Sequence, residues 1–97
     1  MARSRQEILL QLKSAKPGLE REFPLRRLAL FGSWAREEAS ANSDVDLLVE
    51  VDPSIGLRFV TLAERLEAVL GQRVDLVSQR AIRPRLWKLI EPELIDV

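Results

Sequence analysis

Apolar residues recur at helical spacing in the first part of the chain. Residues 4–7, Ser-Arg-Gln-Glu, have the pattern of a capping box, and Ile8 and Leu12 follow on one apolar stripe. Pro17 and Gly18 come next. Because proline removes a backbone donor and glycine is common at helix ends, we expect the helix to end there.

Farther along, short apolar runs alternate with segments of helical spacing, which predicts an α/β chain. In chain order we expect a strand at 27–31, a short helix at 34–39, a strand at 44–51, a helix within 55–70, a strand at 73–77, a helix at 83–91 and a short strand at 94–97. The run 47–49 is apolar on both faces of its strand, so this strand should be central in the sheet. Gly71 suits the end of the helix within 55–70.

The composition of the chain limits the kinds of catalytic and metal-binding site that it can form. The chain has 97 residues, enough for one domain spanning 1–97, with no cysteine, no histidine and a formal net charge of zero. These counts exclude disulfide frameworks, thiol nucleophiles, the usual zinc sites and a histidine base. They also give no general attraction to nucleic acid, so we expect no direct nucleic-acid binding. The apolar runs are too short for a membrane span, and a cytoplasmic protein is the default expectation.

A turn of small residues stands at a fixed distance from two carboxylates. Ten residues separate the pair Gly32-Ser33 from Asp44, and Asp46 follows at the mouth of an apolar strand. In a strand, Asp44 and Asp46 point the same way, and their mutual repulsion favours a bound cation, Mg²⁺ being the natural candidate. Each feature alone has a simpler interpretation, a helix-capping turn or solvated carboxylates. A calcium loop does not fit, because Leu47 stands where that loop requires glycine.

The third strand adds Asp75. A strand–helix–strand crossover of this length normally returns the chain parallel and adjacent, so Asp75 can lie beside Asp44 and Asp46. Three carboxylates are able to hold two metal ions for phosphoryl transfer, and Asp75 could also accept a proton. The alternative is that Asp75 is an ordinary carboxylate at a strand end.

Other conspicuous residues favour structural roles. Trp34 and Trp87 are expected to pack in the interior rather than to stack on bases, because the chain has little aromatic surface. Arg83, Arg85 and Lys88 are expected to form a solvated helix face. Partner binding remains an alternative for these three, since arginine is enriched at interfaces.

The motif resembles the nucleotidyltransferase superfamily of DNA polymerase β, and the segment GSWAREEASANSDVDLLVEVD looks most like its minimal nucleotidyltransferase (MNT) group. The resemblance covers about residues 25 to 97 and implies a small mixed β-sheet flanked by helices, of the α/β (α+β) class. It also implies nucleotide-binding roles for Gly32, Ser33 and Arg36, and metal-binding and catalytic roles for Asp44, Asp46 and Asp75. The family usually has glycine after the arginine, where this chain has Glu37, a negative side chain expected near the polyphosphate path.

The resemblance further implies a function. MNT genes commonly accompany HEPN-domain proteins as toxin–antitoxin pairs, and some members transfer AMP from ATP to a tyrosine of the toxin. We therefore expect a Mg²⁺-dependent nucleotidyltransferase antitoxin, with two metal ions, ATP as substrate and a hetero-oligomeric HEPN partner. Two alternatives stay open. One is a module with little or no catalysis that neutralises the toxin by stoichiometric binding, and the other, less favoured, is nucleotide transfer to a small molecule such as an aminoglycoside.

Overall fold

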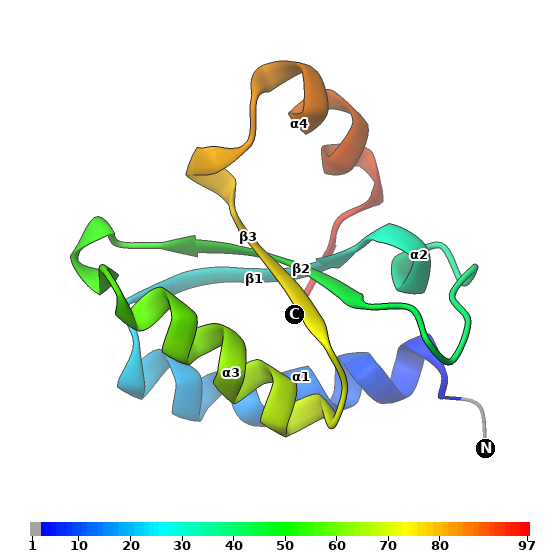
Figure 1. Ribbon diagram of the computed structural model, residues 1–97, viewed down its shortest axis with the longest axis horizontal. Coiled ribbons are helices and arrows are strands. Elements are labelled where there is room, and N and C mark those ends of the chain that lie inside the picture. The colour runs from blue at the N-terminus through cyan, green and yellow to red at the C-terminus, as the bar shows by residue number, and fades with distance from the viewer. Residues whose placement is uncertain (1–2) are drawn as a thin grey trace.

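A computed structural model describes residues 3–97 as a four-stranded mixed sheet with helices on both faces (Figure 1). The strand order is β3-β2-β1-β4. The elements are α1 (Arg5–Glu22), β1 (Leu25–Phe31), α2 (Gly32–Ala35), β2 (Val45–Val51), the 3₁₀ turn η1 (Pro53–Ile55), α3 (Arg58–Leu70), β3 (Val74–Ser78), η2 (Gln79–Ala81), α4 (Pro84–Ile90), η3 (Glu91–Glu93) and β4 (Ile95–Asp96). The predicted fold class and the order of helices and strands are confirmed.

The register of the strands places the carboxylates. Strand β2 pairs antiparallel with β1, where Phe31 lies opposite Asp46, and parallel with β3, where Asp46 lies opposite Asp75. The inner position predicted for the 44–51 strand is therefore confirmed, as is the parallel return of β3 beside it.

Alternation along the strands divides the interior between the two faces of the sheet. The face covered by α1 and α3 holds the larger cluster, which includes Ile8, Leu12, Leu28, Leu30, Val45, Leu47, Val49, Leu62 and Leu66. The face covered by α4 holds a smaller one, Ala29, Phe31, Leu48 and Ile90, with Trp87 packed against it. Figure 1 shows α1 and α3 side by side on one side of the strands and α4 on the other.

Helix α1 is longer than predicted. The capping contact is present, since the Ser4 hydroxyl accepts the Glu7 amide at 3.1 Å, but the helix continues through Pro17 to Glu22. The expectation that Pro17 and Gly18 end it is wrong. An interior proline costs about 3 kcal/mol, and burial of Leu19 in the second half of the helix offsets this cost through packing that local propensity does not contain.

Helix α2 is shorter than predicted and begins earlier, at Gly32. The expected helix at 34–39 is wrong in its extent because Glu37 adopts a left-handed conformation, φ 60°, which helical backbone does not allow. Trp34 is buried, and its indole N–H donates to the Ser43 carbonyl at 3.1 Å, as expected of a packing residue. At the end of α3, Gly71 takes the left-handed capping conformation that was predicted, φ 63°.

None of the helices within residues 3–97 combines the length and the apolar character that crossing a bilayer requires.

Candidate functional site

A cleft of about 410 Å³ opens where the carboxylate-bearing ends of β2 and β3 meet the turn after β1. Helix α4 and η3 form its opposite wall. The lining residues are Phe31, Gly32, Ser33, Arg36, Asp46, Asp75, Val77, Leu86, Ile90 and Glu93. The structure therefore brings together five of the six residues that the sequence singled out, all except Asp44.

Gly32 is required by the close approach of Asp46. Its φ is +76°, and a Cβ atom at this position would lie 2.0 Å from Asp46 Oδ2. Any larger residue would both strain the backbone and displace the carboxylate. The small-residue turn and the acidic residue are thus parts of one packed unit, which the spacing alone could only suggest.

The charge of Asp46 is disfavoured by its surroundings. Burial, then repulsion from Asp75 and from Asp44, raises the pKa of Asp46 from 3.8 to about 6, against a smaller opposing effect of Arg36. A group that loses part of its hydration and faces like charges gains from a nearby cation. Asp46 and Asp75 are register partners on adjacent strands and line the same cleft.

Asp44 stands apart from this pair. It precedes β2, its side chain is 50% exposed, and Oδ1 lies 3.9 Å from Nε of Arg73. It lines a separate hollow with Asn42 and Arg73. Within residues 3–97, no group of three or more acidic side chains converges closely enough to hold a metal ion by itself.

The donor set nevertheless fits Mg²⁺ that is bound together with a substrate. Magnesium usually takes one or two carboxylates and completes its shell with water and substrate phosphates. Asp46 and Asp75 supply two carboxylates, and the disfavoured charge of Asp46 is the observation in their favour. A site of this kind depends on the phosphates and does not need three protein ligands.

Arg36 is held in place by two acidic side chains. Its Nε donates to Glu38 at 3.0 Å, and Nη1 donates to Glu93 Oε2 at 3.0 Å. Glu93 also accepts the Gly32 amide N–H through Oε1 at 3.0 Å. The sequence reasoning missed Glu93, because the contact joins residues 61 positions apart and no local pattern marks it.

Glu37 does not face the cleft. Its carboxylate pairs with Arg5 Nη2 at 2.7 Å, in a separate hollow that Trp34 also lines. The structure therefore places the Glu37 carboxylate outside the cleft that Gly32, Ser33 and Arg36 line, and its nearness to the polyphosphate path stays a prediction. The left-handed backbone at Glu37 also explains why glycine would suit this position, since glycine adopts φ 60° without strain.

Comparisons with known proteins identify the family of this chain. Residues 12–96 match the family described as nucleotidyltransferase domain. The protein adenylyltransferase MntA of Thermococcus cleftensis is 40% identical over 94 residues, which cover 95% of this chain and 94% of that protein.

Solved structures share the fold. A presumed minimal nucleotidyltransferase superimposes with a TM-score of 0.82 at 34% identity, over 98% of this chain and 97% of the other. A chain from a toxin–antitoxin complex with AMP-PNP superimposes with a TM-score of 0.67 at 26% identity, over 95% of this chain and 70% of the other. The family match and the identity to MntA show that the chain is a nucleotidyltransferase and belongs to the minimal nucleotidyltransferase (MNT) family of the polymerase β-like superfamily.

Proposed function

We propose that this chain is an antitoxin that transfers AMP from ATP, with Mg²⁺, to a tyrosine hydroxyl of a cognate HEPN-domain toxin. The observation that carries the proposal is the contact between the Gly32 turn and Asp46 in the cleft shared with Asp75. Its support from relatives is the adenylyltransferase MntA at 40% identity and the related toxin–antitoxin chain crystallised with AMP-PNP, an ATP analogue.

We assign different roles to the residues that line the cleft. Ser33 and Arg36 would bind the phosphates, with the Gly32 backbone allowing their close approach. Asp46 and Asp75 would hold Mg²⁺, which when bound neutralises phosphate charge in the transition state. Asp44 would join them as a ligand after its side chain turns away from Arg73.

The reaction is an in-line displacement. The tyrosine oxygen forms a bond to the α-phosphorus of ATP, the bond from that phosphorus to the bridging oxygen breaks, and pyrophosphate leaves. The hydroxyl proton must be accepted as the new bond forms, and Asp75, exposed at the cleft, is our candidate base.

The acceptor has to be brought by another protein. The cleft has a volume of about 410 Å³, within the range of about 300–1,000 Å³ typical of sites for one small molecule. A nucleotide would occupy most of it, so a tyrosine on a partner surface is the acceptor that fits best.

A second function, neutralisation of the toxin by binding alone, draws on two observations. Asp44 is turned toward Arg73, and α4 carries exposed Leu86 and Leu89 beside the cleft, where a partner could dock. The two functions differ in stoichiometry, because a transferase modifies many copies whereas a covering module must remain bound.

The experiment incubates the cognate HEPN protein with a substoichiometric amount of this chain, ATP and Mg²⁺, and measures the intact mass of the partner. We expect AMP to be added to most copies, and the addition to be lost in Asp46→Asn. Glu50→Gln is the matched control, since Glu50 lies on the same strand and the same face but outside the cleft. Inhibition that needs full stoichiometry and survives Asp46→Asn would favour the binding module.

A further inference from the structure

Glu93 connects the two walls of the cleft. It lies in η3, directly after α4, and its side chain crosses to the turn at Gly32. The Glu93 side chain is 24% exposed, and its carboxylate contacts both the Gly32 amide and the Arg36 guanidinium. These two groups belong to the turn that we assign to phosphate binding.

The contacts of Glu93 leave other donors of the turn available. Among residues 3–97, no acceptor is bound to the Ser33 amide, to its hydroxyl or to Nη2 of Arg36. Glu93 takes only the Gly32 N–H and Nη1 of Arg36. A phosphate can therefore bind this turn while Glu93 remains in place.

The Gly32 amide needs an acceptor of its own. Gly32 is buried, and a buried N–H without a partner costs about 1–3 kcal/mol. Within residues 3–97, the Glu93 carboxylate accepts this N–H and no strand carbonyl does. Glu93 supplies the missing acceptor and thereby fixes the backbone against which Asp46 packs.

We infer that Glu93 is a positioning residue for the nucleotide, one that holds the Gly32 turn in its binding conformation and aims Arg36 into the cleft. The inference rests on the proposed function. The opposite role, an internal carboxylate that competes with phosphate for Arg36, predicts opposite effects of substitution, so the two can be separated by affinity.

The test compares the affinity for AMP-PNP, in the presence of Mg²⁺, between the wild-type chain and variants at Glu93. Calorimetry measures each affinity at a temperature below the melting temperature of that variant. Removing both contacts in Glu93→Ala should weaken binding by at least about tenfold. Glu93→Gln keeps an acceptor for Gly32 and loses the charge opposite Arg36, so its loss should be intermediate. Glu91→Gln, in the same turn but outside the cleft, should stay within about twofold of the wild type.

A coupling measurement separates positioning from a general loss of structure. If Glu93 acts through Arg36, the loss caused by Glu93→Gln should largely disappear in an Arg36→Met background. An equal loss in both backgrounds, unchanged affinity, or tighter binding in Glu93→Ala would each overturn the inference. Absence of binding by the wild-type chain would instead overturn the proposed function.

Discussion

Helices α1 and α3 cover one face of the sheet with apolar side chains, whereas α4 covers the other with one short helix of which only Ile90 is buried. Both faces are built from the same strands. On β2, Val45 and Leu47 point to the α1–α3 face, and Asp46 between them lines the cleft. The first face supplies stability, and the second leaves room for charged groups and a ligand.

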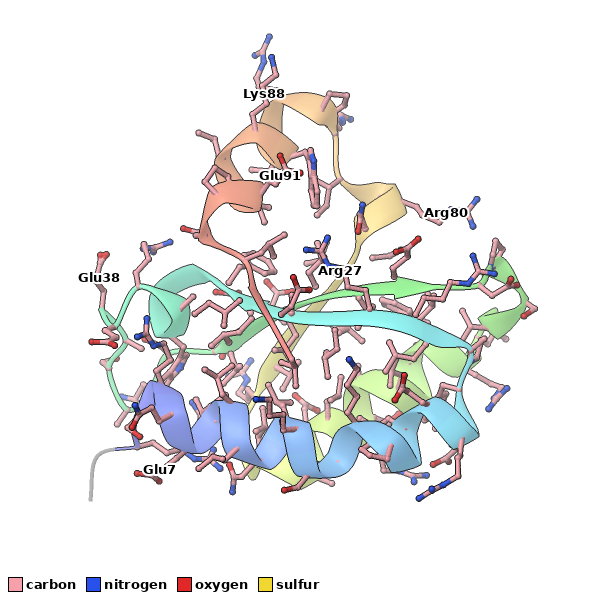
Figure 2. All side chains as sticks on the ribbon, turned by 180° about the vertical axis from the view of Figure 1, so that it is seen from behind. Glu7, Arg27, Glu38, Arg80, Lys88 and Glu91 are labelled. Carbon is pink, nitrogen blue, oxygen red and sulfur yellow. The ribbon has the colours of Figure 1, made fainter. Side chains whose placement is uncertain are left out.

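The opening on the α4 side follows from the length and position of that helix. Helix α4 has seven residues, and its outer side is exposed, with Lys88 pointing away from the sheet in Figure 2. It does not reach across the ends of β2 and β3. The carboxylates there remain accessible, at the cost of a small hydrophobic cluster on this side.

The comparison predicts that the same substitution, leucine to alanine, lowers the free energy of unfolding by different amounts on the two faces of the sheet. Leu66 in α3 is fully buried, and Leu66→Ala should lower the free energy of unfolding by about 2–5 kcal/mol. Leu89 in α4 is 71% exposed, and Leu89→Ala should change it by less than about 0.5 kcal/mol. Urea denaturation measures both, and similar losses would mean that α4 is as important for stability as α3.

Alanine at two glycines separates backbone strain from damage to the cleft. Gly32 and Gly71 both have positive φ, 76° and 63°, so each substitution should cost about 1–2 kcal/mol. Only at Gly32 would the new Cβ meet Asp46. Gly32→Ala should therefore also abolish Mg²⁺-dependent AMP-PNP binding, while Gly71→Ala should retain it in calorimetry; loss of binding in both would point to strain alone.

The half-buried charge at Asp46 should make the open face destabilising at neutral pH. Its pKa is raised from 3.8 to about 6, so the folded state binds a proton that the unfolded state has released, and stability falls as pH rises through this interval. Asp46→Asn should raise the metal-free stability at neutral pH by about 1 kcal/mol after allowance for solvent screening.

That gain should vanish near about pH 3, below the pKa of this carboxyl in both the folded and the unfolded state, where the wild-type group is largely neutral in each. Thermal melts at both pH values measure it, with Glu50→Gln as the control on the same strand. A gain that is equal at both pH values would show that the charge of Asp46 is not its cause.

A small effect is expected at Glu37, whose side chain lies outside the cleft and pairs with Arg5. Glu37→Gly removes left-handed backbone strain of about 1–2 kcal/mol, which stabilises the folded state. Two effects of the same substitution oppose this gain: glycine makes the unfolded chain more flexible, and the exposed ion pair with Arg5 is lost. The net change in stability should stay within about 1 kcal/mol, and AMP-PNP affinity should be unchanged. Markedly tighter binding would place the Glu37 carboxylate near the phosphates after all.

Much of the fold was predictable because the spacing of apolar residues within a strand or helix decides which face each side chain occupies. The period of two on β2 and the crossover through α3 were enough to place Asp46 beside Asp75. The predictions failed where long-range contacts decide. Burial of Leu19 carries α1 through Pro17, and Glu93 reaches Gly32 from the other end of the chain.

The sequence predicted which residues gather at the candidate site better than it predicted how their side chains are oriented. The spacing from the Gly32 turn identified Asp44 and Asp46 as a pair, yet Asp44 precedes the strand and turns to Arg73. A period-two argument holds only inside a strand, which begins here at Val45. The orientation of Asp44 therefore depends on loop contacts that no periodic pattern contains.

The central claim is that Mg²⁺ and ATP bind on the α4 face, between the Gly32 turn and the ends of β2 and β3. The most direct measurement is an NMR titration of the ¹⁵N-labelled chain with AMP-PNP, with and without Mg²⁺. We expect the amide signals of Gly32, Ser33, Asp46 and Asp75 to shift together, more strongly with Mg²⁺, while those of α1 and α3 remain in place. Shifts confined to the separate hollow lined by Arg5 and Trp34, or shifts that ignore Mg²⁺, would contradict the account.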